Sequence, residues 1–254
     1  MNFPDQKSVV FMYHNIAAET PEIDFPEWEA AYDVTLDNFL RHMQRMETDS
    51  SNGASIHVTF DDGYRSFYEH VLSRILPSSQ VQFTCFITTS AIGKKGMLDA
   101  GEIRKLHENG VQIGAHSHSH VFLENLLEGS LQDELFLPKV KLEDAIGAEV
   151  ASFSLPGGRY DERAIVAAQK FGYREIYTSL PGYCPLNFRG CDEVKLFPRW
   201  LVEGKTTSLE IEKILNYEKN YVFRKKCRYF FGKTAKHVLG NNFYHTLWRK
   251  AAKS

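Results

Sequence analysis

The feature that most constrains the fold of this chain is a repeated alternation of short apolar runs, rich in β-branched and aromatic residues, with longer stretches of helical periodicity. Seven runs predict strands: 8–16, 55–63, 81–89, 111–117, 151–158, 173–179 and 193–200. Because alternating strands and helices favour parallel strands joined by right-handed crossovers, the pattern predicts an α/β fold. Seven units suit a barrel better than an open sheet, and chemistry in a barrel gathers at the carboxyl ends of its strands.

Five helical stretches separate these runs, at 35–47, 65–76, 99–109, 131–146 and 161–171. Thr35 stands at a helix N-cap position, and Asp99 with Glu102 has the spacing of a capping box. Beyond residue 205 the pattern becomes helical, basic and aromatic. We therefore expect a barrel over 1–205 and a basic aromatic helical extension over 206–254, packed on or beside it.

Charge is unevenly distributed along the chain. From Lys219 onward the sequence has ten of its 30 Lys and Arg residues and none of its 32 Asp and Glu residues, which leaves a formal charge of −12 on residues 1–218. Such a tail is typical either of helices at an anionic membrane surface or of a helix docked on an acidic body. Nothing indicates base readout, so no nucleic acid partner is expected.

The first residues lack the basic and apolar regions of a secretory signal, and no apolar run is long enough for a transmembrane helix. We therefore expect a soluble cytoplasmic protein, peripheral to the inner membrane where the tail binds lipid. The four cysteines are widely spaced without a CxxC pair, which indicates neither a disulfide framework nor a thiolate zinc site.

Two adjacent carboxylates follow the second predicted strand, in "VTFDDG" (58–63). Asp62-Gly63 alone is a common turn dipeptide. Adjacent like charges at a strand end also repel each other unless a cation compensates, which favours metal binding or acid/base chemistry. Both interpretations remain open for Asp61 and Asp62 taken by themselves.

Three histidines alternate in "GAHSHSH" (114–120), at the end of another predicted strand. On a helix-like turn, His116 and His120 share a face and His118 points away; on a continuing strand all three share a face. A solvated polar loop is the alternative. Combined with the carboxylates, two imidazoles and one aspartate form a three-ligand set that leaves coordination positions open, while the second aspartate is free to act as a base.

The pair "TFDDG" (59–63) and "HSHSH" (116–120) resembles the first two motifs of the polysaccharide deacetylases, the NodB-homology group or family 4 of the carbohydrate esterases, in order, strand context and separation. The resemblance covers residues 8–200 and implies a distorted (β/α)7 barrel. It also implies that Asp61 is the general base and that Asp62, His116 and His120 bind a divalent metal, commonly zinc.

The segment "YHNI" (13–16) resembles the YHxI segment of a sub-branch that includes deacetylases of surface polysaccharides. This resemblance places His14 in the cavity, whereas a core or capping histidine is the simpler interpretation.

The chain departs from the family pattern at three motifs. In "FSLPGGRYD" (153–161), Pro156 and Gly158 are kept, but Ser154 replaces an Arg and Gly157 an aromatic residue. The Gly157 N–H can still stabilise an oxyanion, because a main-chain donor needs no side chain. The Asp-Trp pair of the fourth motif is not found near 177–183, and we expect the absence of both that Asp and the Arg to leave no charge unpaired.

The fifth motif, normally Leu-x-His, appears as "LFPRW" (196–200) without the histidine that serves as general acid. Arg199 or His14 would then stabilise or protonate the leaving group, although Arg is a poor acid. Near the rim, we expect sugar contacts from Pro156, Tyr160, Phe197 and Trp200, with simple packing as the alternative for the three aromatic residues.

These residues predict metal-dependent hydrolysis of an N-acetyl group from an N-acetylated sugar, in a surface polysaccharide or its precursor. Two alternatives stay open. One is a hydrolase that acts on the C–N bond of a small molecule with the same site. The other is a glycan-binding module that has kept the pocket and lost turnover.

Overall fold

A computed structural model describes residues 8–17, 30–51, 53–72, 74–124, 126–183, 186–188 and 191–239. The chain divides into two compact units, Met1–Glu212 and Lys213–Ser254. The first unit has the predicted strands and all the candidate site residues. The predicted domain boundary after residue 205 lies shortly before this division.

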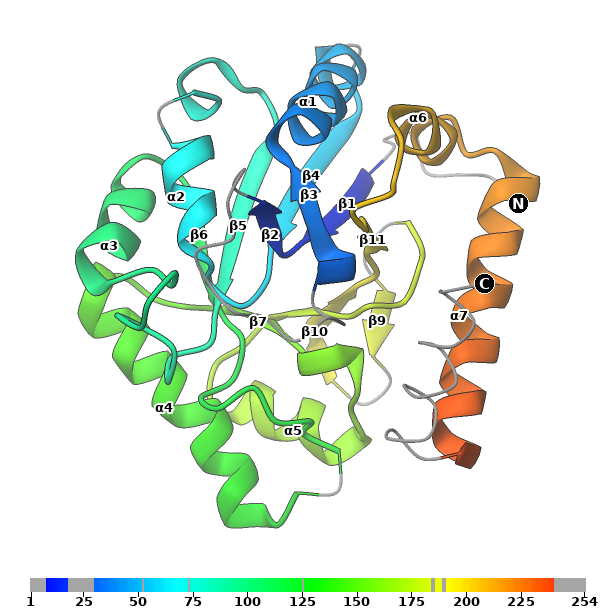
Figure 1. The fold of residues 1–254 in the computed structure, drawn as a ribbon. Coiled ribbons are helices and arrows are strands. Elements are labelled where there is room, and N and C mark those ends of the chain that lie inside the picture. Colours follow the sequence, from blue (N-terminus) through cyan, green and yellow to red (C-terminus); the bar gives the residue numbers. More distant parts are fainter. Residues whose placement is uncertain are drawn as a thin grey trace. The chain divides into compact units, whose positions relative to one another are not determined.

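The first unit is built on one curled sheet in which eight strands run parallel (Figure 1). In sheet order these are β11 (Trp200–Leu201), β1 (Ser8–Tyr13), β4 (Ser55–Phe60), β5 (Gln82–Ile87), β6 (Gln112–Ala115), β7 (Ser152–Ser154), β8 (Glu175–Tyr177) and β10 (Cys191–Phe197). A ninth strand, β9 (Leu186–Phe188), pairs antiparallel with β10. Two short strands, β2 (Asn15–Ala17) and β3 (Asp33–Thr35), form a separate parallel pair.

Strands β10 and β11 join the two edges of the sheet. β10 pairs with β8, where Leu196 lies opposite Ile176, and β11 pairs with β1, where Trp200 lies opposite Phe11. Only Pro198 and Arg199 separate β10 from β11. Counted as one bent strand, β10 and β11 complete a distorted seven-stranded barrel, which confirms the predicted fold class.

Five helices surround this sheet on its outer side (Figure 1). They are α1 (Leu36–Ser51), α2 (Arg65–Val71), α3 (Ala100–Glu108), α4 (Glu128–Ile146) and α5 (Glu162–Lys170). Thr35 Oγ1 accepts a hydrogen bond from the Asn38 N–H, and Asp99 forms the predicted capping box with Glu102. α2 ends earlier than predicted, and a separate 3-10 turn (Leu76–Ser78) contains Pro77.

Aromatic residues fill both sides of the sheet. Between the sheet and the helices, Phe60 stacks on Tyr13 and packs against Phe67 of α2. Inside the barrel, Phe86 packs against Tyr177 and Val10 in a buried hydrophobic cluster. Phe86 lies two residues before Thr88, which follows β5, and Tyr177 is the last residue of β8, so this cluster forms an apolar floor below the polar residues that follow the two strands.

The remaining described helices are α6 (Ser208–Leu215) and α7 (Lys219–Leu239), together with 3-10 turns at Ala30–Tyr32 and Pro156–Gly158. α7 lies in the second unit and contains most of the basic residues of the tail.

Candidate active site

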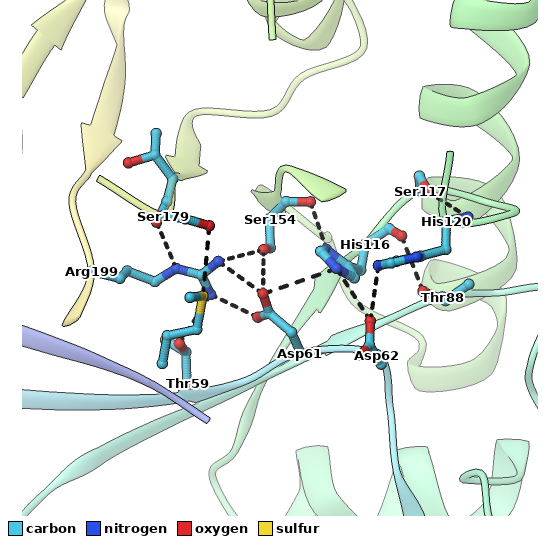
Figure 2. A network of polar contacts seen from close by, with 12 residues as sticks. Thr59, Asp61, Asp62, Thr88, His116, Ser117, His120, Ser154, Ser179 and Arg199 are labelled. Carbon is cyan, nitrogen blue, oxygen red and sulfur yellow. Dashed lines mark hydrogen bonds and ion pairs between the residues drawn. The ribbon is translucent and has the colours of Figure 1, made fainter. Parts of the chain in front are cut away.

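The carboxyl ends of the strands bring the predicted polar residues together (Figure 2). Asp61 and Asp62 directly follow β4, and His116 directly follows β6. His120 lies four residues later, on the loop that leads to α4. Because the carboxyl ends of parallel strands meet at one edge, residues distant in the sequence come within contact of one another here.

Asp62, His116 and His120 form a candidate metal centre. Asp62 Oδ1 lies 3.3 Å from His116 Nε2 and 3.2 Å from His120 Nε2. One ligand atom from each residue lies within 4.8 Å of the other two. Asp62 Oδ1 is buried and makes no hydrogen bond of standard geometry to the described residues. A cation shared by the three atoms would satisfy this oxygen, and a carboxylate with two imidazoles is a donor set that suits zinc.

The turn geometry selects two of the three histidines. β6 ends at Ala115, and Ser117 adopts a left-handed backbone with φ 60°, so the strand alternation stops. His118 turns away and its Nδ1 lies 2.9 Å from Thr89 Oγ1. Of the two open arrangements, the structure therefore has the one in which His118 is outside the cluster.

A backbone carbonyl fixes the orientation of His116. Its Nδ1 lies 2.8 Å from the carbonyl oxygen of Ser154, which can only accept a hydrogen bond. The proton of a neutral ring is therefore on Nδ1, and the Nε2 lone pair points toward Asp62. This is the tautomer that a metal ligand requires.

The backbone is strained at three positions of the site. Asp62, Ser117 and His120 have φ values of 74°, 60° and 59°. A left-handed backbone costs a non-glycine residue about 1–2 kcal/mol. Strain of this kind is retained where the surrounding structure enforces it, and it concentrates at functional sites.

Asp61 lies beside this cluster in a different environment. It is 2% exposed, and its Oδ2 lies 3.9 Å from His116 Nε2. Arg199 donates to both carboxylate oxygens, over 2.7 Å to Oδ1 and 2.8 Å to Oδ2. Ser154 Oγ donates to Oδ2 over 3.0 Å. The two adjacent carboxylates are thus separated: Asp62 faces the imidazoles, with which it was predicted to act, and Asp61 faces a guanidinium, which was not predicted.

Both carboxylates are held in the ionised form. Burial raises the pKa of the Asp61 carboxyl, but the charge and hydrogen bonds of Arg199, with a smaller effect of the neighbouring His116, outweigh burial and leave the pKa below its ordinary value. Burial also raises the pKa of Asp62, and its contacts with His116 and His120 hold the pKa well below the ordinary range.

The role predicted for Arg199 at the leaving group is wrong. Arg199 is fully buried, and its contacts use all five of its N–H groups. Besides the two bonds to Asp61, Nε donates to the Thr178 carbonyl and Nη1 to Thr59 Oγ1. The second Nη2 hydrogen bond goes to Ser154 Oγ. No donor is left for a substrate, so Arg199 acts on Asp61 instead.

His14 lies at the end of β1, and its ring stacks on Tyr32 with a centroid distance of 4.7 Å. Its Nδ1 is buried and has no hydrogen-bond partner among the described residues. Burial lowers the pKa of His14, and the nearby charges of Asp62 and Asp61 oppose that shift. His14 is therefore close enough to the carboxylates to feel their charge, and its role as an acid stays a prediction.

Gly157 is required by the local geometry. It has φ 60°, and a Cβ at this position would lie 2.6 Å from Cε1 of the Phe122 ring. A side chain here would therefore be strained, and the partly exposed Phe122 ring would have to move to make room for it. The Phe122 ring thus lies beside Gly157, the residue that stands where the family motif has an aromatic residue. The oxyanion role of the Gly157 N–H stays a prediction.

Two of the residues predicted to contact sugar pack against other side chains of the protein. Trp200 is 2% exposed and its ring centroid lies 5.1 Å from that of Tyr183, so the prediction that Trp200 forms a platform is wrong. Phe197 stacks on Tyr177 at 4.7 Å and packs against the apolar floor. Pro156 is buried and Tyr160 is half-buried. Substrate contact by Pro156 and Tyr160 stays a prediction.

Sequence reasoning missed two residues that contact the site. Ser154 bridges Arg199 and Asp61, and Glu134 binds the backbone of the histidine loop. For the contact of Arg199 with Asp61 a signal was present, since a buried carboxylate needs a cation and Arg199 lies near the end of the last predicted apolar run. For Glu134, on a helix with many charged residues, the sequence has no comparable signal.

The comparisons with known proteins agree on one family. The model of the polysaccharide deacetylase family matches residues 48–176. The putative polysaccharide deacetylase YxkH of Bacillus subtilis is 26% identical over 184 residues, which cover 69% of this chain and 66% of that protein. The peptidoglycan-N-acetylmuramic acid deacetylase PdaA of the same species is 25% identical over 127 residues, which cover 50% of this chain and 47% of that protein. The chain thus spans about half to two thirds of the length of these curated relatives.

Solved structures show the same fold. A polysaccharide deacetylase from Bacillus cereus superposes with a TM-score of 0.69 at 22% identity, covering 83% of this chain and 69% of that chain. The Streptococcus pyogenes deacetylase PplD, solved in complex with acetate, superposes with a TM-score of 0.68 at 20% identity, covering 82% of this chain and 98% of that chain.

Proposed function

This chain belongs to the polysaccharide deacetylase family, and we propose that it hydrolyses the N-acetyl group of an N-acetylated sugar in a surface polysaccharide or its precursor. The observation that carries the proposal is the separation of two adjacent carboxylates. Asp62 contacts two imidazoles, while Asp61 lies beside them, ionised and within 3.9 Å of His116 Nε2. Hydrolysis at an acyl carbon needs these two functions, activation of the carbonyl and removal of a proton from water.

The residues present fit a divalent metal. Asp62, His116 and His120 would hold it, and zinc suits their donor atoms. A bound ion of this kind acts as a Lewis acid toward the acyl oxygen and lowers the pKa of water.

Asp61 is the group placed to take the proton from water. Its negative charge at neutral pH makes it available as an acceptor, because Arg199 keeps its pKa low despite burial. The low pKa makes Asp61 a weak base, so it depends on the acidification of the water beside it. Ser154 and Arg199 orient the carboxylate.

Two further groups complete the proposed reaction. The Gly157 N–H would stabilise the negative charge on the acyl oxygen in the tetrahedral intermediate. His14 would donate a proton to the departing amine; the nearby charges of Asp62 and Asp61 favour the protonated ring that this role needs, against burial, which lowers the pKa of His14.

Acetate release tests this proposal. The purified chain, supplied with zinc, is expected to release acetate from N-acetylhexosamine oligomers or from lipid-linked or nucleotide-linked N-acetyl sugars. Asp61→Asn is expected to abolish release, and His118→Ala, outside the cluster, to retain it. Release only from small non-sugar amides would favour the C–N hydrolase alternative. Glycan binding without release would favour the binding module.

We propose in addition that the second unit binds anionic lipid. Within α7, Phe223, Phe230 and Phe231 are 68%, 54% and 76% exposed, and Arg224 and Arg228 are exposed on the same helix. Exposed aromatic rings next to cations are typical of interfacial helices. Among the described residues, none of the helices has the length and apolar character that a membrane crossing needs. The tail aromatics Phe243, Tyr244 and Trp248 lie outside the described residues.

Vesicle binding tests the lipid proposal. The full chain is expected to sediment with anionic vesicles at low salt, to be released at high salt, and to bind neutral vesicles weakly. The same proposal places the protein in the cytoplasm at the inner membrane. Equal binding to neutral and anionic vesicles would contradict it.

A further inference from the structure

A carboxylate from α4 binds the backbone of the histidine loop. Glu134 Oε2 accepts hydrogen bonds from the N–H groups of His118 and Ser119, both over 2.8 Å. Glu134 Oε1 accepts a hydrogen bond from Ser119 Oγ over 2.5 Å. The side chain is 9% exposed. Charge-assisted hydrogen bonds in a partly desolvated place are stronger than neutral ones, so this contact fixes the loop firmly.

The loop that Glu134 holds connects two proposed metal ligands. His116 is at its start and His120 at its end, and Ser117 and His120 have left-handed backbones. The loop is also bonded to the segment after β5, where the Ser90 N–H donates to the His118 carbonyl over 2.8 Å. Within the loop, the His120 N–H donates to Ser117 Oγ over 3.0 Å.

Of the groups that hold this loop, Glu134 is the one that carries charge and belongs to a helix outside the sheet. Without it, the N–H groups of His118 and Ser119 would lose their acceptor. The strained backbone of Ser117 and His120 would then relax toward ordinary φ values, which swings His120 relative to His116.

We propose that Glu134 is a positioning residue for the metal centre: by binding the His118 and Ser119 amides, it keeps His116 and His120 at the separation at which both contact Asp62. This inference rests on the proposed metal site. The hydrogen bonds of Glu134 go to two backbone N–H groups and to Ser119 Oγ, so it acts through the loop and not as a ligand. Groups that orient metal ligands in this indirect way typically contribute a factor of about 10–100 in metal affinity.

Metal affinity measured directly tests the proposal. Glu134→Ala is expected to weaken zinc binding by about 10–100-fold, measured by competition with a chromophoric chelator. Glu134→Gln keeps one acceptor oxygen and is expected to lose less. With cobalt as the probe, the absorption spectrum of Glu134→Ala should change in shape, because the two imidazoles no longer reach the ion in the same geometry.

Glu143 on the same helix supplies a matched control. Its carboxylate also accepts a backbone N–H, that of Val150 over 3.0 Å, and pairs with Lys139 over 2.8 Å. It lies nine residues after Glu134, about 13 Å further along α4. Glu143→Ala is expected to destabilise the fold and to leave zinc affinity and the cobalt spectrum unchanged.

Amide hydrogen exchange gives a readout that needs no metal. In the metal-free protein, Glu134→Gln should speed exchange at His118 and Ser119 and leave other loops unchanged. If Glu134→Ala does not fold, Glu134→Gln carries the test. Zinc affinity equal to that of the wild type in a folded Glu134 variant would overturn the inference. A wild type that binds no zinc would instead remove the proposed function.

Discussion

The Arg199 guanidinium and the Asp61 carboxylate form a two-pronged ion pair inside the barrel, with N–O distances of 2.7 and 2.8 Å. Arg199 lies in the two-residue link between β10 and β11, the link that completes the barrel. Closure of the sheet therefore positions Arg199 beside Asp61, the proposed base. Ser154 shares the pair from β7, accepting from Arg199 and donating to Asp61.

Replacing Arg199 should affect stability. Arg199→Met leaves Asp61 buried without a counter-ion, which is expected to cost about 3–5 kcal/mol in the free energy of unfolding at pH 7, measured with urea. Arg174→Met is the matched control, because Arg174 makes an equally bidentate pair with Glu149 at the exposed surface. We expect little change there. A similar loss in both variants would contradict the importance of burial.

The same variant should change the pH dependence of acetate release. Arg199 holds the pKa of Asp61 below its ordinary value against the effect of burial. Without the guanidinium, burial dominates and the pKa of Asp61 rises. The acid limb of the pH–rate profile is therefore expected to move to higher pH in Arg199→Met. If the acid limb does not move, it reports the titration of a group other than Asp61.

Gly157→Ala should be destabilising for two reasons that a control can separate. Gly93 also has a positive φ, 76°, but a Cβ there would meet nothing within 4 Å. Gly93→Ala is therefore expected to cost about 1–2 kcal/mol from backbone strain alone. At Gly157 the Phe122 ring adds steric overlap, so the cost should be larger. Phe122→Ala in the Gly157→Ala background should recover the difference, measured by thermal unfolding.

His57 should make the fold less stable in mild acid. Burial, assisted by Arg199, lowers the pKa of His57 to about 4, and its Nε2 lies 2.7 Å from Thr84 Oγ1. The unfolded chain therefore binds this proton at higher pH than the folded one, so stability is full above the ordinary pKa and falls as pH decreases through it. Between pH 7 and pH 5 the loss from this residue is expected to be about 2 kcal/mol.

The contribution of His57 is isolated by comparison with His57→Gln, which can still bond to Thr84 but does not titrate. Its free energy of unfolding should fall less steeply between pH 7 and pH 5 than that of the wild type. Parallel curves would show that the His57 proton is not coupled to folding.

Zinc should stabilise the folded protein. Because the three proposed ligands converge only when the chain is folded, zinc at 100 times its dissociation constant is expected to add about 2.7 kcal/mol, and a chelator should remove it. His116→Ala and His120→Ala should abolish the zinc-dependent rise in melting temperature, and His118→Ala should keep it. A response to zinc that survives loss of His116 would place the ion elsewhere.

The sequence was sufficient for the strand ends and for the four residues that gather there. Asp61, Asp62 and His116 directly follow apolar runs and His120 lies four residues after His116, and the carboxyl ends of parallel strands meet whatever the details of packing. The sequence left open whether His118 belongs to the cluster. The answer depends on the left-handed backbone of Ser117, which nothing in the local sequence requires.

The errors have a common physical origin. Whether Trp200 and Phe197 lie at the rim or in the core depends on how β10 and β11 bend around Pro198, and strand alternation does not reveal that bend. The partner of Asp61 depends on the same closure, since Arg199 is distant from it in the sequence. Short edge elements such as β9, and the β2–β3 pair, have too few residues for a periodic pattern to be seen.

The distance along the chain between Asp61 and Arg199, 138 residues, has a consequence for biosynthesis. A nascent polypeptide that has left the ribosome as far as β8 already has every proposed zinc ligand, yet its interior carboxylate has no counter-charge. The ion pair of Asp61 with Arg199 therefore forms only when the last strands close the barrel. Hydrolytic competence would thus wait for the C-terminal part of the barrel to be made, although the zinc ligands are all made earlier.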